Sequence, residues 1–250
     1  MTTPPLMDID ALALRVRDYG VNTLSPVVTM MMSGVYATGA LALADILRTP
    51  DERWVRLSIW IYLTLMSTTG ITRQLHMNTH YPQPFLAALP LQLATGSVMA
   101  SSFACLPLNS GGVDGWLYSI ALPLLFSPLL LLMPKLISDH LRPEYFDAAS
   151  RPAIAARVAS TFAQFRVAPL QILVSASFVL FVWVTRGTVG PWDAIVAAAY
   201  VLLSLSVVTV LFMEVRDFTK FVANVEAARV AELARRTRAA EQPTLPIKSP

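Results

Sequence analysis

The sequence predicts an all-α, polytopic membrane protein with six transmembrane helices, and three observations carry this prediction. Hydrophobic residues make up 55% of the 250-residue chain and charged residues 14%, against about 25% in an ordinary soluble domain. The mean hydropathy is +0.55. The charged residues are separated by long uncharged stretches, which cover 19–44, 57–72, 74–113, 115–134, 167–185 and 194–213.

Uncharged stretches indicate membrane spans because an ionised side chain at the centre of a transmembrane helix costs about 3 kcal/mol. Most of these stretches reach the roughly 20 residues that cross a hydrocarbon core. The second is the shortest, but Arg56 and Arg73 at its ends can extend toward the headgroups. We therefore expect transmembrane helices at about 22–46, 54–72, 85–106, 116–135, 166–186 and 192–213.

The distribution of basic residues predicts the orientation of these helices. With six spans, 15 of the 19 Lys and Arg residues lie on the side of the two termini. The positive-inside rule then predicts a bacterial-type inner membrane protein with both termini in the cytoplasm. A five-span arrangement would separate the basic 135–166 loop from the basic tail, so it is the second choice. The four basic residues on the other side are Arg48, Arg53, Arg56 and Arg186.

The segments between the spans have different expected structures. Residues 1–21 form a cytoplasmic N-terminal segment, and the first span follows without a signal-peptide cleavage pattern. Between the third and fourth spans, Asn109, Gly111 and Gly112 predict a tight hairpin. Between the fourth and fifth spans, we expect an amphipathic helix at about 144–165 in the inner headgroup layer. Its apolar positions recur at helical spacing: Ile154, Val158, Phe162 and Phe165.

The C-terminal part continues the sixth span as a cytoplasmic helix over 214–241, followed by a disordered tail over 242–250. Its basic end, Arg235, Arg236 and Arg238, suits anionic lipid or an acidic partner. An apolar stripe along this helix is interrupted by Arg229, so a coiled coil is only weakly indicated. The stripe contains Val215, Phe218, Val222 and Val225.

Small and polar residues within the spans indicate where helices pack. Gly34, Thr38 and Ala42 lie four residues apart and predict a close helix–helix contact. A polar face on the third span meets the fifth span either as a hydrogen-bonded seam, which is favoured, or as the wall of a wet cavity. The residues of this intramembrane polar face are Gln92, Thr95, Ser102 and Gln171.

The three histidines, His76, His80 and His140, all fall on the predicted cytoplasmic side. His76 and His80 are four residues apart, but the residues after them, including Pro82 and Pro84, favour a non-helical polar turn. A metal or haem site and a pH-sensitive role are the less favoured alternatives. We expect no catalytic residues, no metal and no cofactor.

The sequence predicts the environment of this protein better than its function. The favoured hypothesis is a non-enzymatic subunit of an oligomeric channel, transporter or envelope complex, supported by the polar third span and by prolines in the fourth. One alternative is a membrane-embedded enzyme with a histidine-based metal or haem site. Another is a scaffold that binds a cytoplasmic partner through its C-terminal helix. The lipid bilayer and a homo-oligomer or larger complex are the expected partners, and nucleic acid is not.

Overall fold

The computed structural model describes residues 7–18, 26–50, 52–80, 89–110, 113–126, 141–166, 168–185 and 192–241. In these residues the chain is almost entirely α-helical, so the predicted all-α class is confirmed. The other elements of the described residues are a short 3-10 helix, η3 (Pro143–Tyr145), and a hairpin of two strands, β1 (Asn109–Ser110) and β2 (Val113–Asp114). The helices are α1 (Ile9–Arg17), α2 (Pro26–Arg48), α3 (Arg53–His80), α4 (Leu89–Cys105), α5 (Gly115–Phe126), α7 (Arg151–Phe165), α8 (Ala168–Thr185) and α9 (Trp192–Glu241).

Each predicted span coincides with a helix, but the helices differ in length and composition. Within the described residues, two helices are long and apolar enough to cross a membrane: Thr29–Arg48 of α2, and α9. The apolar parts of α4, α5 and α8 are shorter, and α3 is long but carries Arg53, Arg56 and Arg73. The fourth predicted span extends beyond the described end of α5 at Phe126, so Pro128 and Pro134 lie outside the described residues.

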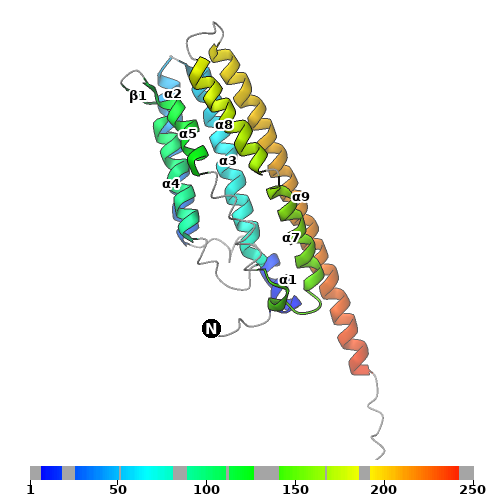
Figure 1. Cartoon of the computed structure of the whole chain (residues 1–250). Helices are drawn as coiled ribbons and strands as arrows, with labels where there is room; N and C mark the ends of the chain where they lie inside the picture. Colours follow the sequence, from blue (N-terminus) through cyan, green and yellow to red (C-terminus); the bar gives the residue numbers. More distant parts are fainter. Residues whose placement is uncertain are drawn as a thin grey trace, which may run out of the picture.

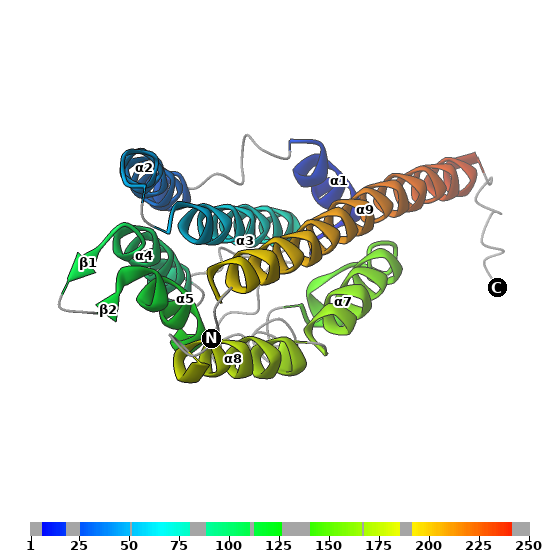
Figure 2. The ribbon, with the colours of Figure 1, turned by 90° about the horizontal axis from the view of Figure 1, so that it is seen from above.

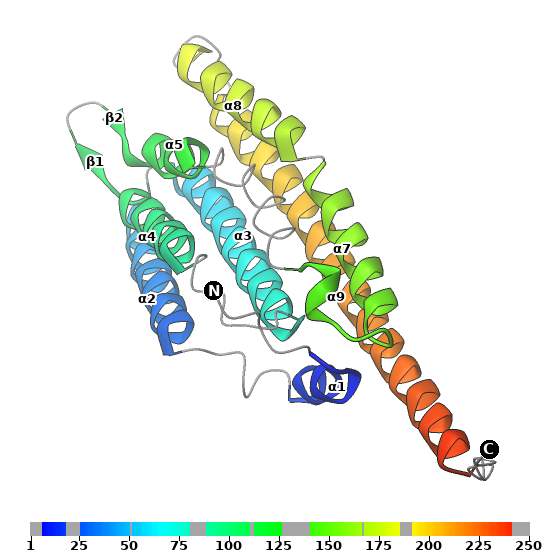
Figure 3. The ribbon, with the colours of Figure 1, turned by 60° about the horizontal axis from the view of Figure 1, so that its bottom comes forward.

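The helices form an elongated bundle in which α3 and α9 lie side by side at the centre (Figures 1 and 2). The α2–α3 turn, the β1–β2 hairpin and the start of α9 lie at one end of the bundle. α1, α7 and the far end of α9 lie toward the other end (Figure 3). We refer to these as the hairpin end and the tail end.

Buried apolar side chains form a separate core at each end. The hairpin-end core joins α2, α3, α4, α5, α8 and the start of α9, and the tail-end core joins α1, α3, α7 and the middle of α9. Members of the hairpin-end core include Ile46, Ile59, Leu63, Phe103 and Trp116. Members of the tail-end core include Ile9, Leu12, Phe146, Phe218 and Val225.

Large apolar side chains that remain exposed concentrate along the helices of the hairpin-end half. Leu202 on α9 is 67% exposed and Phe212 is 68% exposed. An apolar surface of this extent is unusual for a soluble monomer and marks a membrane or protein interaction surface. Others on α2 and α8 include Met30, Leu41, Leu170, Leu173, Phe181 and Trp183.

The N-terminal segment, for which the sequence analysis predicted no helix, contains α1. Asp8 caps this helix, because its carboxylate accepts a hydrogen bond from the Ala11 backbone N–H at 2.7 Å. Met7 pairs with Phe146 in a parallel bridge, and the Ile9 N–H donates to the Asp147 carboxylate at 3.1 Å. α1 is therefore attached to the segment that leads into α7.

Two connections differ in how well the sequence predicted them. The expected hairpin is present as the antiparallel β1–β2 pair, and only glycine fits at Gly115 behind it. A Cβ there would lie 2.0 Å from the Cys105 carbonyl oxygen and 2.4 Å from that of Leu108.

The predicted non-helical turn around His76 is wrong, because α3 continues to His80. The prolines that were expected to end the helix earlier follow its last residue.

Candidate functional site

A buried ionic cluster lies where the hairpin-end half of α9 meets its tail-end half. Its centre is Glu214, whose side chain is 1% exposed. The Nδ1 atom of His76 lies 2.8 Å from Glu214 Oε1, and the Nε atom of Arg73 lies 3.8 Å from Oε2. Arg157 donates from a terminal guanidinium nitrogen to Oε1. We call these four residues the Glu214 cluster; it joins α3, α7 and α9.

Helical spacing directs these side chains to one point. On α9, Glu214 lies on a buried stripe with Phe218, Phe221 and Val225, which are four, seven and eleven residues further on. On α3, Arg73 and His76 are three residues apart and therefore share a face. On α7, Arg157 likewise lies on the buried face of its helix.

The buried stripe of α7 explains the position of Arg157. Ser150, Ile154, Arg157 and Thr161 are all buried and follow a spacing of three or four residues. The apolar face predicted for this helix is present, but Ile154 and Phe165 pack within the tail-end core. α7 thus packs this face in the tail-end core, against α9. The headgroup location predicted for 144–165 stays a prediction.

Aromatic rings enclose the Glu214 cluster. Phe218 stacks on the His76 ring at 3.9 Å between centroids, with an interplanar angle of 2°. Arg73 lies 5.2 Å from the centre of the Phe165 ring, and Arg157 lies 6.0 Å from that of Phe218. These rings limit access of water, so charge interactions inside the cluster are stronger than at the surface.

The environment of Glu214 favours its ionised form. Burial by itself raises the pKa of Glu214, but the hydrogen bond with His76 and the charges of Arg157 and Arg73 lower it to about 2. Burial also lowers the pKa of Arg73, and Glu214 opposes this effect. Two guanidinium groups, those of Arg73 and Arg157, therefore lie against the Glu214 carboxylate.

Arg157 is incompletely hydrogen-bonded despite its burial. Among the residues that the structure describes, one guanidinium nitrogen binds Glu214, while the Nε and the other terminal nitrogen have no hydrogen-bond partner. Its side chain is 1% exposed. Buried guanidinium nitrogens without acceptors are costly, so the pairing with Glu214 only partly offsets the burial of Arg157.

A second buried charge lies at the hairpin end. Arg56 lies 3.4 Å from the Glu52 carboxylate and donates to the Pro107 carbonyl oxygen at 3.3 Å. Glu52 also accepts a hydrogen bond from the indole nitrogen of Trp116 at 3.1 Å, and its φ angle is 51°. This backbone conformation is unfavourable for a non-glycine residue.

The predicted polar intramembrane face can be followed only in part. Gln92 and Gln171 lie on α4 and α8, but their side chains are outside the described residues. Thr95 is exposed, whereas Ser102 is fully buried and donates to the Val98 carbonyl oxygen at 2.8 Å. Ser102 thus forms a hydrogen bond within its own helix. Whether this face meets the fifth span stays a prediction.

The three residues of the predicted small-residue contact on α2 differ in their burial. Gly34 is exposed with open space around it, Thr38 donates to the Gly34 carbonyl oxygen at 2.8 Å, and Ala42 is buried. The close α2–α4 approach instead involves Gly39, which faces Phe103, and Gly96, which faces Met31. Glycines at these two positions let the helices approach each other.

The basic residues of the C-terminal helix are partly neutralised within the chain. Glu232 pairs with Arg235 at 2.8 Å and with Arg236 at 3.0 Å, and their hydrogen bonds lower the pKa of Glu232 to about 2. Arg236 also lies 3.0 Å from Asp10 of α1. Arg238 is exposed. Binding of a partner or lipid by these three arginines stays a prediction.

The histidines do not form a metal site in the part of the chain that is described. No group of three or more His, Cys, Asp or Glu side chains there is placed to hold a metal ion. His76 belongs to the Glu214 cluster. The side chain of His80 and all of His140 lie outside the described residues.

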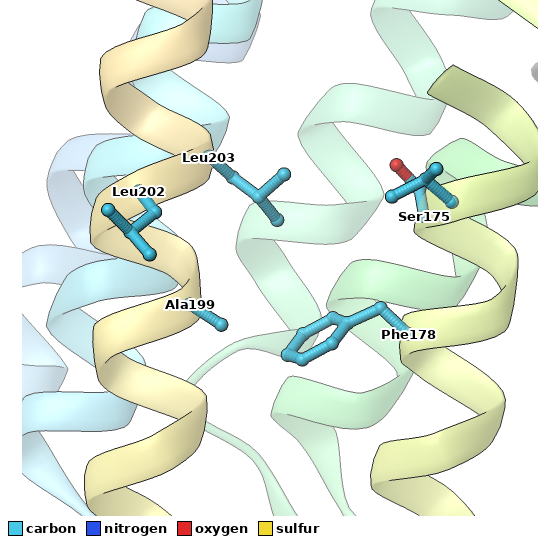
Figure 4. Close-up of a pocket in the computed structure, with 6 residues that line it drawn as sticks. Ser175, Phe178, Ala199, Leu202 and Leu203 are labelled. Carbon is cyan, nitrogen blue, oxygen red and sulfur yellow. The ribbon is translucent and has the colours of Figure 1, made fainter. Parts of the chain in front are cut away.

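A small cavity of about 260 Å³ lies between α8 and α9. In Figure 4, Phe178 from α8 and Leu203 from α9 point into the space between the two helices. Ser175 is the one residue with a polar side chain among those that line it. The cavity therefore suits an apolar group. Its lining consists of Val174, Ser175, Phe178, Ala199, Leu202 and Leu203.

The sequence-based predictions did not include Arg73, Arg157 or Glu214 as site residues. A usable signal was present, because Arg157 lies in register with the buried positions of α7 and Glu214 lies four residues before Phe218. The stripe chosen for the C-terminal helix contained Val215, which is 47% exposed. A search restricted to apolar residues does not detect a buried stripe that contains a charge.

Comparison with known proteins does not assign a family or a function to the chain. No protein-family model matches the chain, and neither a curated protein nor a solved structure matches it.

Proposed function

We propose that this chain is a multi-pass membrane protein in which α2, α3, α4, α5, α8 and the first half of α9 cross the bilayer. The exposed apolar side chains of the hairpin-end half support this arrangement, because water would contact them in a soluble protein. The span-length apolar helices α2 and α9 add support. α1, α7 and the second half of α9 then lie together on one side, which the basic residues assign to the cytoplasm.

Within this arrangement, we propose a non-enzymatic role as a subunit of a membrane complex that binds a cytoplasmic partner. The observation that carries this proposal is α9, one continuous helix of 50 residues. At 1.5 Å per residue it is about 75 Å long, roughly two and a half times the thickness of a bilayer core. Its apolar first half continues without interruption into a charged and largely exposed end.

The end of α9 offers a surface for such a partner. From Glu226 to Glu241 most side chains are exposed, and α1 covers only part of this segment through Asp10. Val230 is 64% exposed and Leu233 is 46% exposed, and their spacing of three residues places them on one face. Exposed apolar residues among charged ones are typical of a helix that packs on another protein.

A channel or transporter function and an enzyme function receive less support from the geometry. The cavity between α8 and α9 has an apolar lining, which does not suit an ion or polar solute. The His76–Glu214 pair lies against Phe218 inside the Glu214 cluster, which suits a structural ion pair better than an exposed reaction site. Channel, transporter and enzyme functions stay predictions from sequence.

In-cell photocrosslinking tests this proposal. A photoreactive amino acid at position 233 should give a discrete crosslink to one other protein, and the double variant Val230→Asp with Leu233→Asp should abolish recovery of that protein. Membrane insertion should be unchanged. A photoreactive residue at position 202, on the apolar half of α9, is the matched control and should give no crosslink to the same protein. Equal recovery from the double variant and the wild type would contradict the proposal.

A further inference from the structure

The cavity between α8 and α9 has a small residue from each helix in its lining. These are Ser175 on α8 and Ala199 on α9, whereas Phe178 and Leu203 in the same lining are large (Figure 4). The Phe178 ring also packs edge to face on Tyr200 of α9, with 5.7 Å between the ring centres. An aromatic contact therefore joins the two helices, and the cavity lies beside this contact.

The size and lining of the cavity limit what can occupy it. Its volume is about 260 Å³, and Ser175 is the one lining residue with a polar side chain. Apolar cavities of about 150 Å³ stay dry and bind benzene, whereas pockets for complete small-molecule ligands measure about 300–1,000 Å³. One turn of an α-helix, about 5.4 Å high and about 10 Å wide, fills roughly 400 Å³. The cavity thus suits part of a hydrocarbon chain better than a complete ligand or a helix.

The cavity lies near the middle of two apolar helical segments and is open at its side. Phe178 is near the centre of α8, and Leu203 is near the centre of the uncharged stretch 194–213 of α9. Two other lining residues form an exposed rim, since Val174 is 54% exposed and Leu202 is 67% exposed. In the membrane arrangement proposed above, this rim lies about 15 Å from either surface of the hydrocarbon core.

We propose that the cavity between α8 and α9 binds the end of an acyl chain of a membrane lipid. This inference rests on the proposed membrane arrangement, because the ends of acyl chains lie at the mid-depth of a bilayer. An empty cavity loses the dispersion contacts that its lining would make with an occupant, and a flexible chain that enters from the side restores them. Contact with both helices then holds this chain more firmly than lipid on a convex helix surface.

Photolabelling of the full chain tests the proposal. The protein is reconstituted in vesicles of phosphatidylethanolamine and phosphatidylglycerol that contain a small fraction of phosphatidylcholine with a diazirine at the end of one acyl chain. Irradiation in the vesicles identifies the surfaces that contact lipid. Irradiation after extraction into a mild detergent identifies the lipid that stays bound, and peptide mapping locates the label in both cases.

The retained label should concentrate in the cavity. After extraction, segments 174–178 and 199–203 should carry roughly fivefold more label than Leu41 and Phe212, because two helices contact the chain in the cavity. Leu41 and Phe212 are exposed apolar residues outside the cavity lining. A second lipid with the diazirine beside the ester group is the control for depth, and it should label the cavity roughly fivefold less.

Two variants that fill the cavity and one matched variant separate retention from general lipid contact. Ala199→Phe and Ser175→Leu each fill the cavity from one helix, and each should lower the retained cavity label by roughly fivefold. Both positions are half-buried, and Tm measurements check that the variants fold. Ala40→Phe places the same ring on the exposed surface of α2 and should leave the cavity label unchanged.

The outcomes distinguish this inference from the membrane arrangement on which it rests. Label on Leu41 and Phe212 in the vesicles, without retained label in the cavity, would overturn acyl-chain binding and leave the membrane arrangement intact. Equal retention by the wild type and Ala199→Phe would also overturn it. A cavity that lipid does not label even in the vesicles would indicate that a side chain of a second copy fills it, which contradicts the proposal. No label on any apolar surface in the vesicles would overturn both.

Discussion

The hairpin-end core and the tail-end core differ in what surrounds them and in how their polar groups are satisfied. Exposed apolar side chains such as Leu202 and Phe212 surround the hairpin-end core. The tail-end core is bordered by ion pairs, including those of Asp10 with Arg229 and Arg236. This difference is expected if the surface of one core faces lipid and that of the other faces water.

Buried serines of the hairpin-end half and Glu214 of the tail-end half are satisfied in different ways. In the hairpin-end half, Ser102, Ser119 and Ser204 donate to carbonyl oxygens of their own helices, four residues earlier. In the tail-end half, Glu214 depends on partners from two other helices. Local hydrogen bonds persist when lipid surrounds a helix, whereas the Glu214 cluster exists only when α3, α7 and α9 are packed together.

The largest expected effect comes from removing the negative charge of this cluster. Glu214→Gln removes the carboxylate that pairs with the buried Arg157 guanidinium and should lower the free energy of unfolding by about 3–5 kcal/mol. Denaturant titration in detergent micelles measures this effect. The control is Asp45→Asn, whose partner Arg48 is 81% exposed, and it should change stability by less than about 1 kcal/mol. Equal effects for the two variants would contradict a buried role for Glu214.

The same charge predicts an acid sensitivity of the tail-end core. The folded pKa of Glu214 is about 2 and lies below the usual value for glutamate of about 4.3. This stabilisation, of about 3 kcal/mol, is fully present above pH 4.3 and is lost as the pH falls toward 2. Hydrogen exchange of α7 against that of α4, measured between pH 5 and pH 2, should show α7 losing protection first. Simultaneous loss in both helices would contradict this prediction.

Matched leucine truncations compare the two cores directly. Leu12 and Leu63 are both 0% exposed, one in each core. Leu12→Ala should cost about 3 kcal/mol, because unfolding exposes this side chain to water. Leu63→Ala should cost about 1–2 kcal/mol, because an unpacked helix in a membrane keeps the side chain in lipid and only the packing contribution is lost. A cost for Leu63→Ala equal to that for Leu12→Ala, by unfolding in bicelles, would argue against a lipid environment.

The smallest expected effects concern the α2–α4 contact. In Gly96→Ala the added Cβ would lie 2.3 Å from Met31 Cγ, so the methionine must move at a cost of about 1 kcal/mol. Gly34→Ala meets open space and should be neutral or stabilising by up to about 1 kcal/mol, since alanine favours the helix. The measured Tm should fall in Gly96→Ala and should not fall in Gly34→Ala. Destabilisation by Gly34→Ala would indicate an additional packing partner at Gly34.

Charge distribution was sufficient to predict where most helices lie, because the cost of burying charge acts on each residue separately. α1 was missed although Ile9, Leu12, Ala13 and Val16 have helical spacing, since the segment was considered only as a polar end. The extension of α3 to His80 was missed because the prolines beyond it were given too much weight.

The Glu214 cluster could not have been assembled from sequence alone. Glu214 is 138 residues from His76 and 57 residues from Arg157 in the chain, and local periodicity cannot pair such distant positions. The same applies to Asp10, which meets Arg236 across 226 residues. Helical spacing indicates which side chains share a face, but only tertiary packing decides which faces meet.

Site-directed labelling tests the central claim that the two cores lie in different surroundings. In a Cys105→Ser background, single cysteines replace Arg48 at the hairpin end, Leu202 on the apolar half of α9, and Arg238 near its end. In intact spheroplasts, a membrane-impermeant maleimide should label position 48; position 238 should react only after permeabilisation, and position 202 should react slowly in both cases. Labelling of positions 48 and 238 from the same side, or rapid labelling of position 202, would contradict the claim.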